Sequence, residues 1–172
     1  MNKLFICQAV FFAFLFISGC GGDENEFQNA YENSAGGLLW SSKMPGHSDW
    51  FYAERYCEAL SEQGFKDWRL PTVDELRTLI RNCEVTETGG TCKVSEKCLA
   101  YTDCRNSSCD GCEYDGLGKY SILGDSRMFW SSSVTSENNL KVWYVNFDYG
   151  EINSTFKTAS DNVNYTRCVR QN

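Results

Sequence analysis

The chain has 172 residues, a formal net charge of -7 at pH 7 and an aromatic content of 15%. This length is sufficient for one domain with a hydrophobic core. The acidic balance argues against nucleic acid as a partner, because such binding needs a basic surface that displaces counterions. Neutral sugars, peptides and divalent cations remain open as ligands.

Residues 1–19 have the pattern of a secretory signal peptide. Lys3 precedes an apolar run of residues 4–17, which is too short for a comfortable membrane span. The run leads into Ile-Ser-Gly-Cys, which resembles a bacterial lipobox and implies that Cys20 becomes the lipidated N-terminus, carrying acyl chains such as palmitate. Two such chains anchor a protein stably to a membrane. An ordinary signal peptide, with Cys20 incidental, is the alternative.

The residues after Cys20 bear on location and spacing. An aspartate directly after the lipidated cysteine would resemble an inner-membrane retention signal, but this chain has Gly21 there. We therefore expect a cell-envelope lipoprotein in the outer membrane of a cell with two membranes. Residues 20–37 contain four acidic residues and no basic one, which predicts a flexible tether. Its mean reach would be about 20–25 Å. The alternative is that part of this segment adds an edge strand.

The folded domain is expected to span residues 38–172 and to begin with a short strand and a helix. Leu38 to Ser42 read as the strand, and residues 47–64 as the helix, with Ser48 or Asp49 as its cap and Gly64 just beyond its end. The buried stripe follows helical spacing: Trp50, Ala53, Cys57 and Leu60.

The segment Asp-Trp-Arg-Leu-Pro-Thr, residues 67–72, reads as an extended piece that leads into a second helix. Thr72 and Glu75 form a capping box, and Asp67 is expected to pair with Arg69. A ligand role for Arg69 is the alternative. The expected buried face of the helix is Val73, Leu76, Leu79 and Ile80.

These segments together carry a family resemblance. The spacing from Trp50 to Ile80 is W-x2-A-x2-YC-x2-L-x3-G-x2-DWRLPT-x2-EL-x2-LI, followed later by FWSSS, VWYVNFDYGEI and RCVR. It resembles the Lcl C-terminal domain family, which is common in bacterial surface lipoproteins. The resemblance covers roughly residues 38–170, apart from residues 83–118.

The resemblance implies an α+β fold like that of C-type lectins and of formylglycine-generating sulfatase modifiers. Two helices would flank a small, mostly antiparallel sheet, and the chain ends would lie together. Some relatives bind sulfated polysaccharides, but a fold does not by itself determine a ligand.

The second half of the chain reads as strands. We expect one strand over residues 128–134 and a hairpin over residues 141–158, with Tyr149 and Gly150 in its turn. Residues 163–170 are expected to close the same sheet, with Cys168 on one face. The opposite face would hold Val163, Tyr165, Arg167 and Val169.

Ten cysteines are present, and eight remain once Cys7 and Cys20 are set aside. In an exported protein an even number indicates disulfides before metal. The family resemblance implies that Cys57 pairs with Cys168. The other six staple an insertion over residues 83–118, and their pairing stays open: Cys83, Cys92, Cys98, Cys104, Cys109 and Cys112. A metal site is the alternative, but only Cys109 and Cys112 have C-x2-C spacing.

Evidence for other cofactors and for catalysis is weak. Calcium would need oxygen ligands, and the first candidate set is Asn146, Asp148, Glu151 and Asn153, with Asp103, Asp110 and Asp115 as the other. His47 is the single histidine and is expected to be a loop or capping residue. We therefore expect no enzyme and assign no catalytic residue. Free thiols would instead favour an enzyme of the formylglycine-generating class.

The expected function is that of a membrane-tethered binding module that recognises a glycan or another envelope component. Four tyrosines could stack on sugars unless they lie in the core: Tyr114, Tyr120, Tyr144 and Tyr149. A structural or protein-interaction subunit of an envelope complex is the alternative. Sulfated polysaccharides are not expected, because acidic residues interleave the basic ones: Lys141, Lys157, Arg167 and Arg170.

Overall fold

The computed structural model describes residues 32–33, 37–158 and 164–172. The predicted signal peptide, the lipidated cysteine, most of the tether and Val163 lie outside these residues. The described part is α+β, as the sequence predicts, with two three-stranded antiparallel sheets rather than one. No helix among the described residues is long and apolar enough to cross a membrane.

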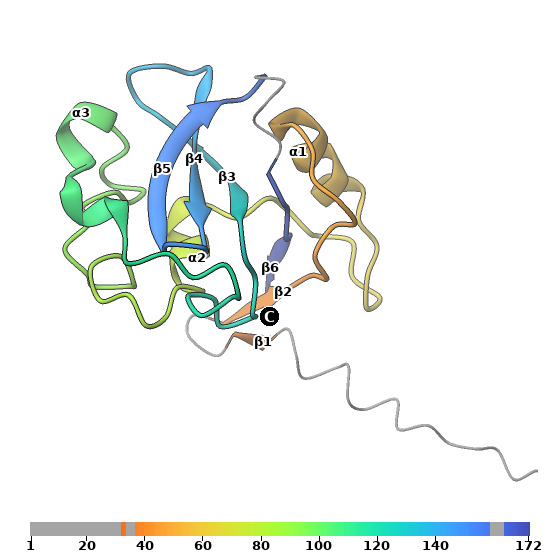
Figure 1. Ribbon diagram of the computed structural model, residues 1–172. Coiled ribbons are helices and arrows are strands. Elements are labelled where there is room, and N and C mark those ends of the chain that lie inside the picture. The colour runs from red at the N-terminus through yellow and green to blue at the C-terminus, as the bar shows by residue number, and fades with distance from the viewer. Residues whose placement is uncertain (1–31, 34–36, 159–163) are drawn as a thin grey trace, which may run out of the picture.

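The smaller sheet brings the two ends of the domain together (Figure 1). Its order is β1 (Glu32–Asn33), β2 (Leu38–Trp40) and β6 (Val169–Gln171). The amide of Asn172 donates to the carbonyl of Gly37 at 2.8 Å. β1 lies within the predicted tether. The alternative that part of this segment adds an edge strand is therefore correct for these two residues.

The C-terminal segment serves both sheets, so the expectation that it closes a single sheet was wrong. Tyr165 exchanges backbone hydrogen bonds with β3 (Met128–Val134), donating to Met128 and accepting from Trp130. The chain then departs from β3, and β6 pairs with β2. The reason is that β1 pairs with only one edge of β2. The other edge, at Leu38, Leu39 and Trp40, pairs with the three residues of β6.

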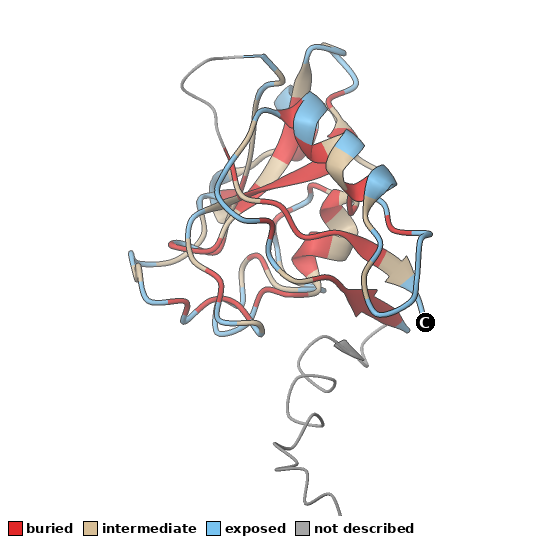
Figure 2. Ribbon diagram, turned by 90° about the vertical axis from the view of Figure 1, so that its right-hand side faces the viewer, coloured by how far each residue is buried: buried red, intermediate tan, exposed pale blue. Residues whose placement is uncertain are grey.

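The larger sheet has the order β3-β4-β5, where β4 is Lys141–Asn146 and β5 is Glu151–Phe156. One face packs on α2 (Val73–Arg77) through a core that includes Trp143, Val145 and Ile152. The other face meets α1 (Trp50–Ala59) through Trp130 and Val142. The two helices therefore cover opposite faces, and Figure 2 shows the buried side of α1 turned toward the sheet.

Helix α1 begins as predicted and ends earlier than predicted. Asp49 is the N-cap, and its side chain accepts from the amide of Tyr52 at 2.8 Å. The helix ends at Ala59, so the placement of Gly64 directly after it was wrong. Gln63 and Gly64 instead have positive φ angles of 54° and 81° in a tight turn that joins Glu62 to Phe65. Such a turn competes with helix continuation because two successive residues must adopt left-handed conformations.

The predicted capping box of α2 is confirmed, whereas the predicted Asp67–Arg69 ion pair was wrong. Glu75 accepts from the amide of Thr72 at 2.8 Å, and the Thr72 hydroxyl accepts from the amide of Glu75. Arg69 bonds the same Glu75, while Asp67 accepts from Arg170 at 2.8 Å. In an extended chain residues two apart are separated by about 7 Å, so neighbouring elements supply closer partners. Burial raises the pKa of Glu75, but hydrogen bonds from Arg69 and Thr72 outweigh it, and the net pKa is lowered.

A buried ion pair ties the C-terminal segment to the loop before β3. Arg167 donates to Asp125 through Nε at 2.6 Å and through Nη2 at 2.9 Å, and its Nη1 bonds the carbonyl of Ser41. Both charged side chains are nearly inaccessible to solvent. Lys43 also approaches Asp125, but only to 4.0 Å. Among the described residues, the guanidinium of Arg167 therefore provides most of the neutralisation of the Asp125 carboxylate.

Candidate functional site

Three disulfides build the insertion as nested loops. The structure joins Cys83 to Cys112, Cys92 to Cys109 and Cys98 to Cys104. A fourth disulfide joins Cys57 to Cys168, which is the pairing that the resemblance implied. Cys109 and Cys112 therefore belong to two different disulfides, and their C-x2-C spacing does not mark a metal site.

Arg77 serves as a central donor for the first half of the insertion, and the sequence analysis missed it. Its buried guanidinium donates to backbone carbonyls of the loop, at 2.7 Å to Thr86 and at 3.0 Å to both Cys92 and Val94. Further bonds reach Glu87 and Gly90. Burial lowers the pKa of Arg77. The sequence signal that could have identified Arg77 was a basic residue at the end of α2, followed by a loop with little apolar content.

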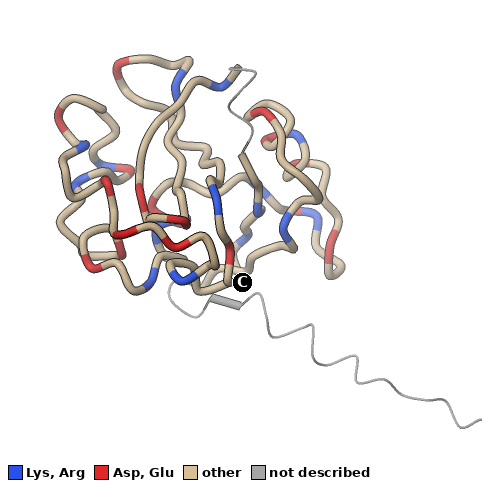
Figure 3. The backbone as a smooth tube through the Cα atoms, in the orientation of Figure 1, with Lys and Arg blue, Asp and Glu red and all other residues tan. Residues whose placement is uncertain are grey.

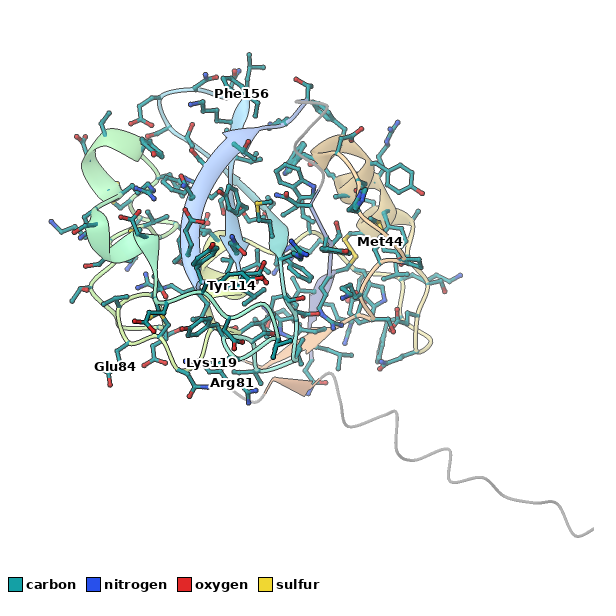
Figure 4. All side chains as sticks on the ribbon, viewed as in Figure 1. Met44, Arg81, Glu84, Tyr114, Lys119 and Phe156 are labelled. Carbon is teal, nitrogen blue, oxygen red and sulfur yellow. A yellow bond between two sulfur atoms is a disulfide. The ribbon has the colours of Figure 1, made fainter. Side chains whose placement is uncertain are left out.

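An exposed pair of tyrosines lies where the insertion meets the turn between β4 and β5. The side chains of Tyr114 and Tyr149 have relative exposures of 62% and 38%, and their ring centroids are 5.2 Å apart at an interplanar angle of 52°. Figure 4 shows Tyr114 in front of the lower ends of the two strands. The pair offers adjacent aromatic surface to a ligand without any change of the core.

Backbone contacts hold this pair in place. The amide of Cys112 donates to the carbonyl of Tyr149, and the amide of Asp115 donates to the carbonyl of Asp148, both at 2.7 Å. A Cβ added at Gly111 would lie 2.3 Å from the carbonyl oxygen of Tyr149. The Cys83 sulfur lies under Gly150, where an added Cβ would approach it to 3.2 Å. The two tyrosines are thus fixed on a turn that a disulfide and two hydrogen bonds support.

The other two candidate tyrosines are less available. Tyr120 is buried, and its hydroxyl donates to the carbonyl of Glu113 at 2.7 Å. Tyr144 is half-buried on β4, and burial raises its pKa, with a further contribution from Glu151. Tyr120 therefore lies in the core, which was the alternative to stacking on a sugar.

The side chains of the two candidate calcium sets bond to other groups of the protein. The described residues contain no group of three or more His, Cys, Asp or Glu side chains that could hold a metal ion. Asn146 accepts from the amide of Asp148, and Asp148 accepts from the amide of Arg127 at 2.8 Å. Glu151 accepts from Asn153. In the other set Asp110 pairs with Arg105, and the carboxylate of Asp115 accepts from the amides of Leu117 and Lys119.

Acidic residues surround the tyrosine pair. Figure 3 shows several acidic positions near the lower ends of β4 and β5 and along the adjoining insertion. Arg105 pairs with Asp110 and lies 3.6 Å from Glu151, whereas the side chain of Arg127 is 69% exposed and lies 3.9 Å from Asp148. The exposed Lys119, which Figure 4 shows below Tyr114, forms no salt bridge with a described residue. Glu113 and Asp115, which flank Tyr114 in the sequence, form no salt bridge with any described residue.

A model of the Lcl C-terminal domain matches residues 29–170. The chain belongs to this family. The match includes residues 29–37, which precede the predicted boundary at residue 38 and contain β1. No curated protein matches the chain.

His47 lies exposed in the loop before α1, and Asp49 caps the helix instead. Its ring packs edge-on against Tyr165, with centroids 6.1 Å apart. The eight cysteines from Cys57 to Cys168 are all joined in disulfides. Among the described residues of this Lcl C-terminal domain, these disulfides therefore leave no free thiol.

Glu137 fixes the short helix α3 (Tyr101–Cys104) of the insertion to the β3–β4 connection. Its carboxylate accepts from the amides of Thr102 and Tyr101 at 2.9 and 2.7 Å. These bonds, that of Thr102 first, lower the pKa of Glu137 from 4.5 to about 2. A depressed pKa stabilises the folded state above the unfolded value, so this contribution is lost as the pH falls from 4.5 through about 2.

We expect the NMR signals of the Tyr101 and Thr102 amides to titrate with a midpoint near 2, the pKa of Glu137. Glu137→Gln should abolish this titration and speed hydrogen exchange at the Thr102 amide at neutral pH. Glu113→Gln, at another exposed glutamate, should leave both unchanged. A wild-type midpoint near 4.5 would show that the two amide bonds do not form in solution.

Proposed function

We propose that the chain is a lipid-anchored module of the cell envelope that binds a glycan through Tyr114 and Tyr149. The observation that carries this proposal is the pair of exposed rings, 5.2 Å apart, on a disulfide-supported turn. The proposed anchor is the lipidated Cys20, in the outer membrane where the cell has two membranes. The proposal needs neither calcium nor another cofactor.

The geometry of the pair suits a sugar ring. Aromatic side chains combine a large apolar surface with a polar hydroxyl, which matches the mixed apolar and polar faces of a carbohydrate. Preorganisation adds to affinity because little side-chain or loop freedom is lost on binding. The backbone bonds from Cys112 and Asp115 to the hairpin turn supply this preorganisation. Nearby carboxylates can accept hydrogen bonds from sugar hydroxyls.

The proposal is for binding without catalysis. Formylglycine-generating chemistry needs a reactive cysteine pair, and Cys57, Cys168 and the six insertion cysteines are disulfide-bonded. The closed disulfides support a binding module over an enzyme of this class.

A glycan array with the purified ectodomain, residues 21–172, tests the proposal. We expect the wild type to bind a defined class of sugar, and Tyr114→Ala or Tyr149→Ala to weaken that binding by tenfold or more, equivalent to about 1.4 kcal/mol. Tyr52→Ala removes an equally exposed tyrosine on α1, at 54% exposure, and should bind as the wild type does. An empty array, or equal losses in all three variants, would contradict the proposal.

Gly116→Ala provides a milder perturbation of the same site. A Cβ at Gly116 would lie 2.4 Å from the Tyr114 hydroxyl, which is the far end of a movable side chain. The ring must therefore shift while the backbone keeps its conformation. We expect this variant to unfold at the wild-type temperature and to bind the sugar more weakly.

A subunit of an envelope protein complex is the second candidate function. The outer side of α1 has a hollow of about 400 Å³, lined by Tyr52, Arg55, Tyr56, Ala59, Leu60 and Ser61. Tyr52, Arg55 and Ala59 follow each other at helical spacing on the exposed side of α1, whereas Tyr56 and Leu60 also pack against the core. A protein partner could bind to this exposed side. If Tyr52→Ala and not Tyr114→Ala abolished envelope association, this candidate would replace the first.

A further inference from the structure

We propose that the site at Tyr114 and Tyr149 selects sugars that carry a free amine over N-acetylated and sulfated ones. This inference rests on the proposed function and specifies its ligand class. It follows from the charges around the two rings, which the tyrosines alone do not determine.

Acidic side chains outnumber basic ones near the pair. Arg105 lies between Asp110 and Glu151, and its side chain is only 17% exposed. Arg127 is 69% exposed and lies 3.9 Å from Asp148, and the exposed Lys119 forms no salt bridge with a described residue. A sulfate or carboxylate on a ligand would meet the like charge of the surrounding carboxylates, which these two cations offset only in part. Polyanions are therefore disfavoured at this site relative to a protonated amine.

Acidic groups near Tyr114 lack a cationic partner. Glu113 is exposed, and neither it nor Asp115 forms a salt bridge with a described residue. Consecutive Cα atoms are about 3.8 Å apart, so both residues lie well within a Debye length of the Tyr114 backbone. The negative potential that they create favours a protonated amine on a sugar stacked over the ring.

The size of the preference can be bounded. One unit charge about 5 Å from another interacts in water by an amount that corresponds to roughly a fourfold change in affinity. We therefore expect a glucosamine tetramer to bind roughly four- to tenfold more tightly than its fully N-acetylated form at low salt. High salt should reduce this ratio toward one, because the charges are exposed to solvent.

Calorimetric titration at about pH 6, where the amine is protonated, tests the inference with the glucosamine tetramer, the N-acetylated tetramer and a heparin-derived tetrasaccharide. Glu113→Gln should lower the preference for the amine, because it should weaken binding of the amine tetramer more than binding of the N-acetylated tetramer. Glu58→Gln, at an exposed glutamate of α1, is the matched control and should change neither.

The outcomes separate this inference from the proposed function. Equal binding of the amine and N-acetylated tetramers, with loss in Tyr114→Ala, would overturn the charge preference and leave the glycan site standing. Tightest binding of the heparin fragment would also overturn it. Absence of binding to all sugars, on the tetramers and on the array, would remove the proposed function itself.

Discussion

Replacement of both Cys57 and Cys168 by alanine is expected to lower the free energy of unfolding by about 4–5 kcal/mol. This disulfide links residues separated by 111 positions, so it removes the largest loop entropy from the unfolded chain. It also joins α1 to the residue before β6. Chemical denaturation of the two proteins, followed by tryptophan fluorescence, measures the difference.

The Cys98 and Cys104 pair supplies the control for this disulfide. Its separation is only 6 residues, and the same entropic relation gives a loss of about 2 kcal/mol when both are alanine. Equal losses in the two variants would show that loop entropy does not determine the contribution of these bonds.

Asp125→Ala is expected to destabilise the domain by about 3–5 kcal/mol, because it leaves the Arg167 guanidinium buried without its carboxylate. Both hydrogen bonds between the two side chains, at 2.6 and 2.9 Å, would be lost. Thermal unfolding followed by circular dichroism should show a clear fall in the midpoint temperature.

The double variant Asp125→Leu with Arg167→Met distinguishes a buried charge from a lost contact. Apolar residues at both positions should recover much of the stability, since replacing a whole buried pair is often neutral. If the double variant were no more stable than Asp125→Ala, the destabilisation would come from packing rather than from the unpaired arginine.

Local features were predictable from the sequence because local interactions determine them. The capping box of Thr72 and Glu75 needs only four consecutive residues, and the buried face from Val73 to Ile80 follows helical spacing. The strand at residues 128–134 and the turn at Tyr149 and Gly150 were likewise visible as alternating patterns.

Apart from the Cys57–Cys168 disulfide, which the family resemblance implied, the features that depend on distant partners were not predictable. Asp67 pairs with Arg170, 103 positions away, in preference to the nearby Arg69. The end of α1 depends on a turn at Gln63 and Gly64 and on the bond between Glu62 and Ser42. Such contacts require knowledge of which segments lie side by side.

The candidate site shows the same division. The sequence identified Tyr114 and Tyr149 among four tyrosines but could not separate them from Tyr120, whose burial arises from the packing of the insertion. The nested cysteine pairs could not be chosen from fifteen possibilities. Gly111 and Gly116 were missed because their role is to leave room for the two rings and their backbone.

The most direct test of the glycan site at Tyr114 and Tyr149 is an NMR titration of the ¹⁵N-labelled ectodomain with the sugar that binds best. We expect the amide shifts to concentrate in residues 111–118 and 147–151, around the two exposed tyrosines, and to vanish in the Tyr149→Ala protein. Shifts centred instead on α1, or spread evenly over the domain, would contradict it.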